Sequence, residues 1–224
     1  MSSLEKLGAE RVPGVLDVEL IARIQEVFGD ASRPGHRLTA RQLAPVSDLL
    51  AEGGQIGDIA TVFAKKRAWP VRALLLEKSP KVNWRLGWHQ DRTIAVRRRI
   101  QVPGFSSWTT KAGQLHVQPP PEITASMLTL RVHLDHVGRD NAPLLALAGS
   151  HLLGRLLEEE IEHLVGKAPV LTCLASAGDV WVYRTAIVHA SAEQHKPARR
   201  RVLQIDYATV GLPGGLQWMD LTGG

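Results

Sequence analysis

The chain has 224 residues, of which 44% are hydrophobic and 22% are charged, a composition typical of soluble globular proteins that excludes a largely disordered chain. This length fits one domain, which can bury about 70–75% of its unfolded surface and build a full core. The formal net charge of +5 favours anionic small molecules, but it is too small and too scattered to indicate nucleic-acid binding.

The first part of the chain, about residues 1–70, is predicted to be helical. After Asp17, which can cap a helix, apolar side chains recur at a spacing that places them on one helix face. They are Leu20, Ile21, Ile24, Val27 and Phe28. A loop at residues 32–35 should end this helix, and a second helical region, about residues 45–66, should be broken at residues 53–54 by two glycines.

From residue 71 the pattern changes to short runs rich in Val, Ile, Leu and Thr, separated by Pro, Gly and Asn, which predict strands. These runs are VRALLLEK, TIAVRRRI, MLTLRVHLDHV, DVWVYRTAIVHAS and RRVLQIDYATV. One short helix, EEEIEHLVG, is expected among them. Helices followed by many strands favour a β-sandwich or barrel with helices packed on its outside. We expect a single domain over residues 1–224, with a β core over about residues 71–210.

Cys173 is the only cysteine, so the chain can form neither an intramolecular disulfide nor a thiolate metal cluster. In its leucine-rich stretch it is expected to be a small buried side chain. The first residues, MSSLEKLGAERVPG, lack the apolar run of a signal peptide, and nowhere do about 18 apolar residues occur consecutively. A cytoplasmic protein that does not enter a membrane is therefore expected.

Two predicted strands are unusually polar on one face. Alternation places Arg200, Gln204 and Asp206 opposite Leu203 and Ile205. The run LTLRVHLD likewise gathers its threonine, arginine, histidine and aspartate on one side. Such faces belong either to edge strands that face solvent or to a barrel interior lined with polar groups, and the pattern alone leaves both interpretations open.

The stretch LGWHQDRTI contains a His-x-Asp pair, His89 and Asp91, whose side chains project to the same face of an extended backbone. Two histidines and one carboxylate leave about three coordination positions of an iron ion open, as a non-haem Fe(II) oxygenase requires. His189, in IVHASAEQHKPARRR, is the candidate for the second histidine. With nine histidines in the chain, this spacing alone is weak support, and an ordinary polar strand end remains an alternative.

Arg200 lies eleven residues after His189, on the polar face of its strand. A planar guanidinium can bind a carboxylate through two hydrogen bonds, which suits the distal end of a dicarboxylate such as 2-oxoglutarate. Ser191 shares the face of His189 if that strand continues, and it can donate a hydroxyl to the same carboxylate. The alternative interpretation makes residues 199–201 a solvated basic run.

Taken together, the segments NWRLGWHQD, HVQPP, LRVHLDHVGRDNAPLLALAGSH, AGDVWVYRTAIVHAS and RRRVLQIDYA resemble the phytanoyl-CoA dioxygenase family of Fe(II)/2-oxoglutarate oxygenases, over about residues 70–210. The resemblance implies a double-stranded β-helix, a jelly-roll core of the cupin-like type, with flanking helices. It implies iron bound by His89, Asp91 and His189. It also implies 2-oxoglutarate held by Arg200 and Ser191, with an amide from Asn83 and the ring of Trp108 as further contacts, and O₂ as the second cosubstrate.

The chain departs from the family pattern near the substrate rather than at the metal. It has HLDH, NAPL and AGSH where the family commonly has HLDD, NGPL and PGSH. His133, His136 and His151 in these stretches are expected to be loop or second-sphere residues rather than further ligands, and nothing assigns a role to His116. Asp91 occupies the position that is a small residue in related halogenases, so the resemblance implies hydroxylation.

The expected activity is therefore an Fe(II)- and 2-oxoglutarate-dependent hydroxylation of a small molecule that yields succinate and CO₂. One rival is a nucleic-acid-repair dioxygenase of the same cofactor class, favoured by the pI of about 9.7 and by the arginine triplets at residues 97–99 and 199–201. Against it, the chain lacks the interleaving of aromatic and basic residues expected for base stacking. The other rival is a non-catalytic cupin-like metal-binding module. The sequence indicates neither the primary substrate nor the oligomeric state.

Overall fold

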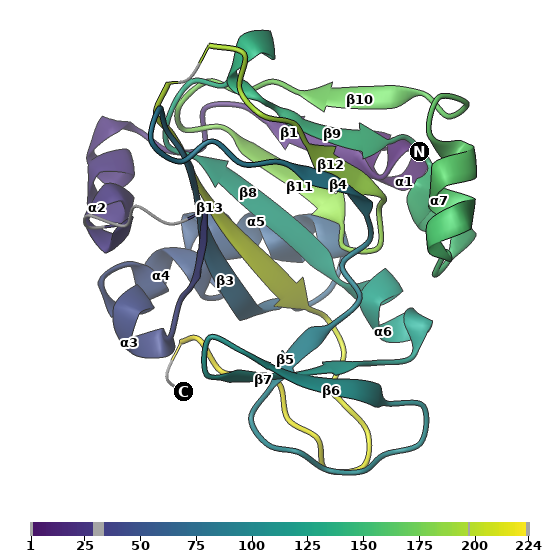
Figure 1. Cartoon of the computed structure of the whole chain (residues 1–224). Helices are drawn as coiled ribbons and strands as arrows, with labels where there is room; N and C mark the ends of the chain where they lie inside the picture. Colours follow the sequence, from purple (N-terminus) through teal and green to yellow (C-terminus); the bar gives the residue numbers. More distant parts are fainter. Residues whose placement is uncertain (1, 29–33, 197, 223–224) are drawn as a thin grey trace.

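The computed structural model describes residues 2–28, 34–196 and 198–222 (Figure 1). Its α-helices are α1 (Ser3–Leu7), α2 (Val18–Phe28), α3 (Ala40–Leu43), α4 (Ser47–Leu50), α5 (Gln55–Ala64), α6 (Pro121–Ser126) and α7 (Glu158–Leu164). Short 3₁₀ helices are η1 (Ala44–Val46), η2 (Arg139–Asn141) and η3 (Ser150–Leu153). Among the described residues, no helix is long and apolar enough to cross a membrane.

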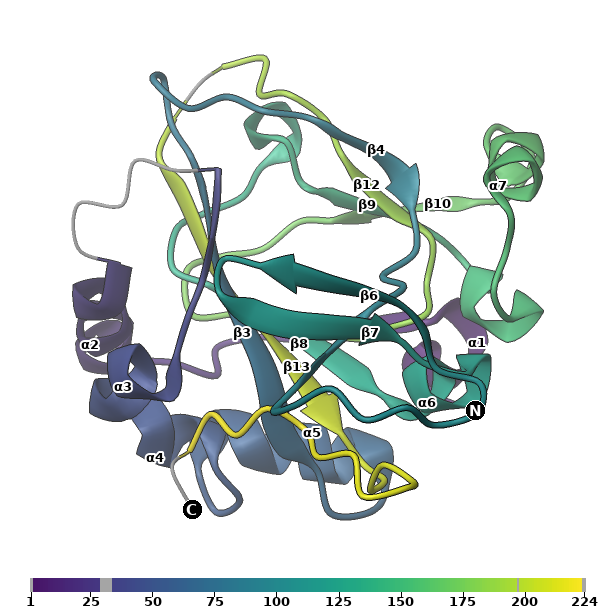
Figure 2. The same ribbon diagram turned by 60° about the horizontal axis from the view of Figure 1, so that its bottom comes forward.

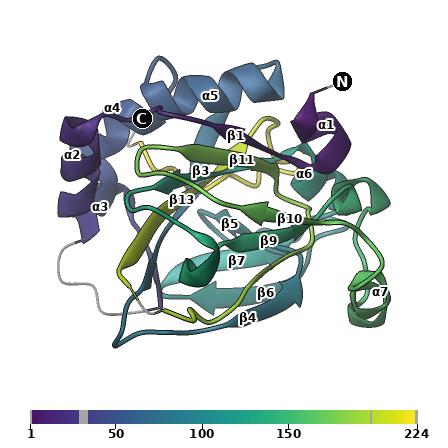
Figure 3. The same cartoon turned by 90° about the horizontal axis from the view of Figure 1, so that it is seen from above.

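Antiparallel sheets form the body of the molecule. The large sheet has six strands in the order β1 (Ala9–Val12), β11 (Val180–Arg184), β8 (Leu128–His133), β13 (Arg200–Ala208), β3 (Trp69–Lys78) and β2 (Gly35–Arg37). The small sheet has four, in the order β10 (Val170–Cys173), β9 (Leu144–Leu147), β12 (His189–Ser191) and β4 (Leu86–His89). Figure 3 shows the two sheets facing each other, the arrangement of a double-stranded β-helix. The predicted fold class is confirmed.

The main apolar core lies between the large sheet and the helices α2 to α5, which lie along its outer face (Figure 1). On β13, Leu203, Ile205 and Tyr207 belong to this core, and the Tyr207 hydroxyl donates to the Leu50 carbonyl at 2.9 Å. Their neighbours on the other face point between the two sheets. Since β13 lies inside the six-stranded order and its polar side chains are buried, the barrel-interior interpretation of the polar faces holds and the solvent-edge interpretation is wrong.

A third sheet, β5 (Ile94–Val96), β7 (Gln114–Gln118) and β6 (Ser106–Lys111), lies across one opening of the barrel (Figure 2). The β6–β7 hairpin turns through two residues with positive φ, Ala112 at 51° and Gly113 at 78°, as a type I′ turn requires. This turn pairs Lys111 with Gln114 across the hairpin. The position of Lys111 beside the barrel opening therefore follows from the turn.

The helical first part of the chain agrees with expectation in its main elements. The predicted amphipathic helix is α2, with the Asp17 carboxylate accepting from the Leu20 amide at 2.9 Å. The break at residues 53–54 separates α4 from α5. Part of the loop expected at residues 32–35 lies outside the described residues. The short strands β1 and β2 were not predicted, and each extends one edge of the large sheet.

Candidate metal centre and its cavity

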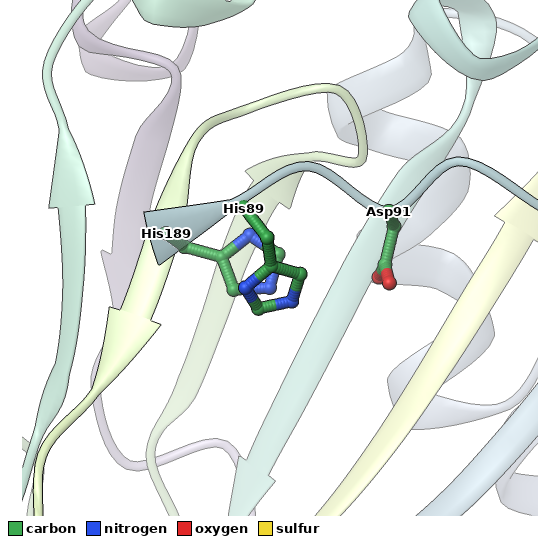
Figure 4. A group of neighbouring side chains, drawn as sticks. All are labelled: His89, Asp91 and His189. Atoms are coloured by element: carbon green, nitrogen blue, oxygen red, sulfur yellow. The ribbon is translucent and has the colours of Figure 1, made fainter. Parts of the chain in front are cut away.

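His89 and Asp91 lie at the point where β4 ends and the chain turns toward β5. His89 is the last residue of β4, and Asp91 follows in the coil (Figure 4). Gln90, between them, is buried, and its amide donates to the carbonyls of Gly154 and Ala186 while accepting from the Leu156 amide, at 2.7–2.9 Å. These hydrogen bonds fix the turn that presents His89 and Asp91 together.

His189, the first residue of β12, is the cross-strand partner of His89. Their ring centroids are 4.3 Å apart, with the ring planes inclined by 54°. One ligand atom from each of His89, Asp91 and His189 can be chosen so that all three lie within 4.8 Å of one another (Figure 4). His189 lies a hundred positions after His89 in the sequence, and the fold brings it together with His89 and Asp91 into a group that could hold one metal ion.

Backbone carbonyls set the orientation of both imidazoles. Nδ1 of His89 donates to the Gly87 carbonyl at 2.8 Å, and Nδ1 of His189 donates to the Ile187 carbonyl at 3.0 Å. Because a carbonyl can only accept, each Nδ1 carries the proton and each Nε2 keeps its lone pair. Burial and the neighbouring His89 lower the pKa of His189 to about 4, so this ring is neutral at physiological pH. In both rings the hydrogen bond at Nδ1 leaves Nε2 as the atom available to a metal.

The Asp91 carboxylate is held by a buried arginine. Arg72, on β3, donates through Nη2 to Asp91 at 2.9 Å and through Nε to Asp206 on β13. Asp206 also accepts from the Thr129 hydroxyl at 3.0 Å. Burial alone would raise the pKa of Asp91, but the charge and hydrogen bond of Arg72, together with the neighbouring histidines, outweigh it and hold that pKa well below its ordinary value. The carboxylate is ionised and positioned from the large sheet.

A cavity of about 820 Å³ opens in front of these three side chains and extends between the two sheets. This volume lies within the range of small-molecule sites and exceeds what 2-oxoglutarate alone would fill. Its apolar lining includes Leu74, Leu76, Trp84, Trp88, Ile161 and Val165. Its basic lining includes Arg37, Arg72, Lys111 and Arg131. The cavity therefore combines an apolar wall with several cations.

Three cations, Lys78, Arg131 and Arg200, are buried in the barrel interior, with exposed fractions of 0%, 4% and 1%. No carboxylate of the described residues forms an ion pair with any of them. Burial and the charge of Arg131 lower the pKa of Arg200 to about 9. Burial lowers the pKa of Lys78 to about 7, with Arg200 and Arg131 adding to the effect. An unpaired buried charge is costly, so this cluster suits an anionic ligand.

Arg200 and Ser191 occupy different positions relative to the cavity. Ser191 lines it beside His189, and its buried hydroxyl has no hydrogen-bond partner. Arg200 is not among the lining residues; its Nη1 donates to the Ala142 carbonyl, while Nε and Nη2 are buried without partners. Arg131 does line the cavity and donates to Gln204 at 2.8 Å. The cavity surface thus offers Arg131 and Ser191, whereas Arg200 is buried outside the lining.

The arginines at residues 199–201 have three different environments. Arg199 pairs with Glu77 at 3.1 Å, and Arg201 pairs with Asp135 at 2.7 Å on the opposite side of the strand from Arg200. The interpretation of this triplet as a solvated basic run is therefore wrong. The alternation of β13 separates the three guanidinium groups and directs only Arg200 into the barrel interior.

The two remaining residues that the family resemblance singled out lie outside the cavity lining. Asn83 bridges to the backbone of Gln194, donating to its carbonyl at 3.2 Å and accepting from its amide at 2.8 Å. Trp108, on β6, packs against the apolar cluster beneath the third sheet, with the Arg99 guanidinium 5.4 Å from its ring centre. The structure does not bring either side chain to the metal-ligand group.

The other histidines that drew attention in the sequence lie apart from this group. His133, on β8, and His116, on β7, are buried with no hydrogen-bond partner at either ring nitrogen. Burial, followed by the charge of Arg72, lowers the pKa of His116 to about 3. His136 is exposed, and a ring nitrogen of His151 lies 3.3 Å from the Glu5 carbonyl. Within the described residues, His89, Asp91 and His189 are the group suited to a metal.

Sequence reasoning missed the cations that position and surround the site. Arg72 lies in VRALLLEK, whose apolar residues predict a strand, and that prediction assigned no role to the arginine. Arg131 was predicted only to belong to the polar face of its strand. The signal for both was the same: a charged residue at an inward position of an otherwise apolar strand, which the alternation pattern identifies once the inward face is known.

Comparison with known proteins gives the same family and the same fold. The sequence profile of the phytanoyl-CoA dioxygenase family (PhyH) matches residues 8–202. No curated protein sequence matches the chain significantly. Among solved structures, AviO1 from Streptomyces viridochromogenes Tue57 is similar with 21% sequence identity and a TM-score of 0.63, over 95% of this chain and 94% of that one.

Two further structures were solved with metal and cosubstrate. The epimerase SnoN, in complex with Fe³⁺, α-ketoglutarate and nogalamycin RO, has 17% identity and a TM-score of 0.63, over 99% of this chain and 93% of its own. HygX from Streptomyces hygroscopicus, with nickel and 2-oxoglutarate bound, has 16% identity and a TM-score of 0.63, over 92% and 85%. At these identities the likeness establishes the fold, a cupin-like double-stranded β-helix.

Proposed function

Since this chain belongs to the phytanoyl-CoA dioxygenase family, we propose that it is an Fe(II)- and 2-oxoglutarate-dependent dioxygenase that hydroxylates a small-molecule substrate. The observation that carries this proposal is the donor set. Two imidazoles with protonated Nδ1 and free Nε2 atoms face an ionised carboxylate, and all three border one cavity. Two histidines and one carboxylate are the ligands of non-haem Fe(II) oxygenases.

Bound iron and 2-oxoglutarate would allow O₂ to act as the oxidant: one oxygen atom would enter succinate, formed with CO₂ from 2-oxoglutarate, and the other would enter the substrate. His89, Asp91 and His189 would hold the ion. The Gly87 and Ile187 carbonyls orient both imidazoles and keep the Nδ1 proton directed away from the metal position. Arg72 keeps the Asp91 carboxylate ionised and directed toward the histidines. The apolar cavity wall would exclude water from the reacting centre.

The buried cations supply the partner for 2-oxoglutarate. Its distal carboxylate would accept hydrogen bonds from Arg200 and the Ser191 hydroxyl, which are buried with unpartnered polar atoms, and from Arg131 at the cavity surface. Lys78 is engaged by the carbonyls of Trp84 and Ala192, so it contributes charge rather than a direct contact. Asn83 and Trp108 do not line the cavity, so we assign neither of them a contact with 2-oxoglutarate.

The metal assignment is tested by iron content after anaerobic reconstitution. Wild type should bind one Fe(II) per chain, and His89→Ala and His189→Ala should each lose it. His136→Ala serves as the matched control, because its exposed ring lies outside the group. Iron retained by both ligand variants would show that the assignment is wrong.

Hydroxylation is tested by the products once a metabolite pool yields succinate release above background. A substrate mass gain of one oxygen, with stoichiometric succinate, is the expected result. SnoN is an epimerase, and a product of unchanged mass would indicate such a reaction here. A product lacking two hydrogens would indicate desaturation or ring closure instead of hydroxylation. A chlorinated product in excess chloride would contradict the role given to Asp91, which fills a coordination position that a halide would need.

A further inference from the structure

Two basic side chains lie together at one side of the cavity, apart from the cation cluster around Arg200. Arg37 is the last residue of β2, and Lys111 is the last residue of β6, and both line the cavity. Figure 2 shows the hairpin turn between β6 and β7 on the side of the barrel away from α7. The acidic lining residues Glu158 and Glu162 belong to α7, so the two ends of the cavity differ in charge.

A buried hydrogen bond holds the two segments together. Gln114 pairs with Lys111 across the β6–β7 hairpin, and its side chain, only 6% exposed, donates to the carbonyl of Leu38 at 2.8 Å. Leu38 directly follows Arg37 and is fully buried. The fold therefore fixes the relative position of two cations from distant parts of the sequence.

Neither cation has an acidic partner among the described residues. The Lys111 amino group donates to the Thr93 hydroxyl at 3.1 Å, and Arg37 has a buried Nε with no hydrogen-bond partner. Asp91 is the acid whose charge acts on the pKa of Lys111, and it already forms an ion pair with Arg72. Burial lowers the pKa of Lys111, and the charges of Arg37 and Arg72 lower it further, so the cations repel one another. Holding them together costs stability that a bound anion would return.

The pair is also close to the candidate metal centre through a short series of contacts. Lys111 contacts Thr93, whose carbonyl accepts from Arg72 at 3.5 Å, and Arg72 in turn binds Asp91. A group held by Arg37 and Lys111 would therefore leave the adjoining part of the same molecule beside the metal ligands.

We propose that Arg37 and Lys111 bind a carboxylate or phosphate group of the primary substrate, whose apolar remainder lies along the cavity wall formed by residues such as Leu74 and Trp88. This inference rests on the proposed function, because it gives the separate cluster of Arg131, Arg200 and Ser191 to 2-oxoglutarate. It narrows the substrate class to an amphipathic anion. The acidic side chains of α7 disfavour the opposite orientation.

The test compares acidic and neutral probes of matched shape. Protein loaded with nickel(II) and saturating 2-oxoglutarate, which binds without turnover, is titrated calorimetrically with 4-phenylbutyrate, 4-phenylbutyramide and phenyl phosphate. The variants are Arg37→Gln/Lys111→Gln and, as a control with the same charge change at exposed positions, Arg41→Gln/Lys66→Gln. Circular dichroism establishes that each variant is folded.

Wild type and the control should bind the acid at least about 10-fold more tightly than the amide, and the Arg37→Gln/Lys111→Gln protein should lose this preference. Tighter binding of phenyl phosphate than of phenylbutyrate would assign the subsite to phosphate, and the reverse order to carboxylate. Equal binding of acid and amide by wild type, or a preference kept by the double variant, would overturn the proposal.

A second measurement separates substrate from cosubstrate. The affinity for 2-oxoglutarate, read from the absorption band it forms with Fe(II) under anaerobic conditions, should change by less than about 3-fold in the double variant. A loss of 10-fold or more would transfer the pair to cosubstrate binding and refute the proposal. If wild type forms no such band, the proposed function fails; the probe titration, repeated on metal-free protein, then still decides whether the anion subsite exists.

Discussion

Replacement of Arg200 by methionine should separate ligand binding from stability. Arg200 is 1% exposed, and only its Nη1 has a partner, the Ala142 carbonyl. Losing that partner costs about 1–3 kcal/mol, but the substitution also removes a buried, unpaired charge of comparable or larger cost. The metal-free, ligand-free Arg200→Met protein should therefore be as stable as wild type, or more stable.

The same substitution should weaken 2-oxoglutarate binding. A hydrogen bond to a charged group contributes about 1.5–3 kcal/mol, which corresponds to a loss of roughly 10- to 150-fold in affinity. At a concentration of 100 times its Kd, 2-oxoglutarate should stabilise the wild-type protein by about 2.7 kcal/mol; after a 100-fold loss the same concentration stabilises by only about 0.4 kcal/mol. Urea denaturation of the nickel(II) protein, with and without 2-oxoglutarate, measures both quantities.

Arg201→Met is the matched control on the next residue. Its guanidinium pairs with Asp135 outside the barrel, so this variant should lose about 1–2 kcal/mol of stability and keep the stabilisation by 2-oxoglutarate. The two variants thus have opposite expected signatures. If Arg200→Met instead lost 3–5 kcal/mol without ligand and kept its response to 2-oxoglutarate, Arg200 would be a structural residue and the reasoning would be refuted.

Three further predictions concern residues around the site. Arg72→Leu should lower the free energy of unfolding by about 3–5 kcal/mol, because it leaves the buried carboxylates of Asp91 and Asp206 unpaired; a change in urea denaturation below about 1 kcal/mol would contradict the ion-pair assignment. Gln90→Ala removes three buried hydrogen bonds, so unfolding should become easier by about 3 kcal/mol and iron affinity should fall, as measured by denaturation and metal titration; unchanged iron affinity would show that Gln90 does not position the ligands. Burial lowers the pKa of Lys78 to about 7, so between about pH 7 and pH 10 the unfolded chain binds more protons than the folded one and stability should rise with pH, by at most about 1.4 kcal/mol per pH unit from this group. Lys78→Met should remove that rise in urea denaturation at pH 7, 8 and 9, and an unchanged slope would place the titrating group elsewhere.

The parts of the fold that were predictable are those with a local pattern. The face of α2 follows from helical spacing, and the inward side chains of β13 follow from alternation. His89 and Asp91 form a pair of the same local kind, two residues apart. The strands β1 and β2 have only four and three residues, and their pairing with β11 and β3 supplies a stability that no short window of sequence contains.

The site itself was predictable only in part, for the same reason. Ser191 follows from its distance to His189, whereas the meeting of Arg37 and Lys111 depends on a hairpin turn and on the Gln114 hydrogen bond. Asn83 illustrates the converse: its distance from His89 suggested a ligand contact, but both ends of its amide bind the backbone of Gln194. Spacing along the chain identifies neighbours in one strand, and long-range contacts decide the rest.

The position of β4 at the end of the small sheet bears on how a metal would leave. Among the described residues this edge strand pairs only with β12, and it carries His89 and leads directly to Asp91. A strand paired on one side can open locally at a free energy below that of global unfolding. Detachment of β4 would withdraw His89, while Arg72 still holds Asp91 and the large sheet and its helices stay folded. The dissociation rate of the ion would then report the fraying of one strand, and it would not follow the overall stability of the protein.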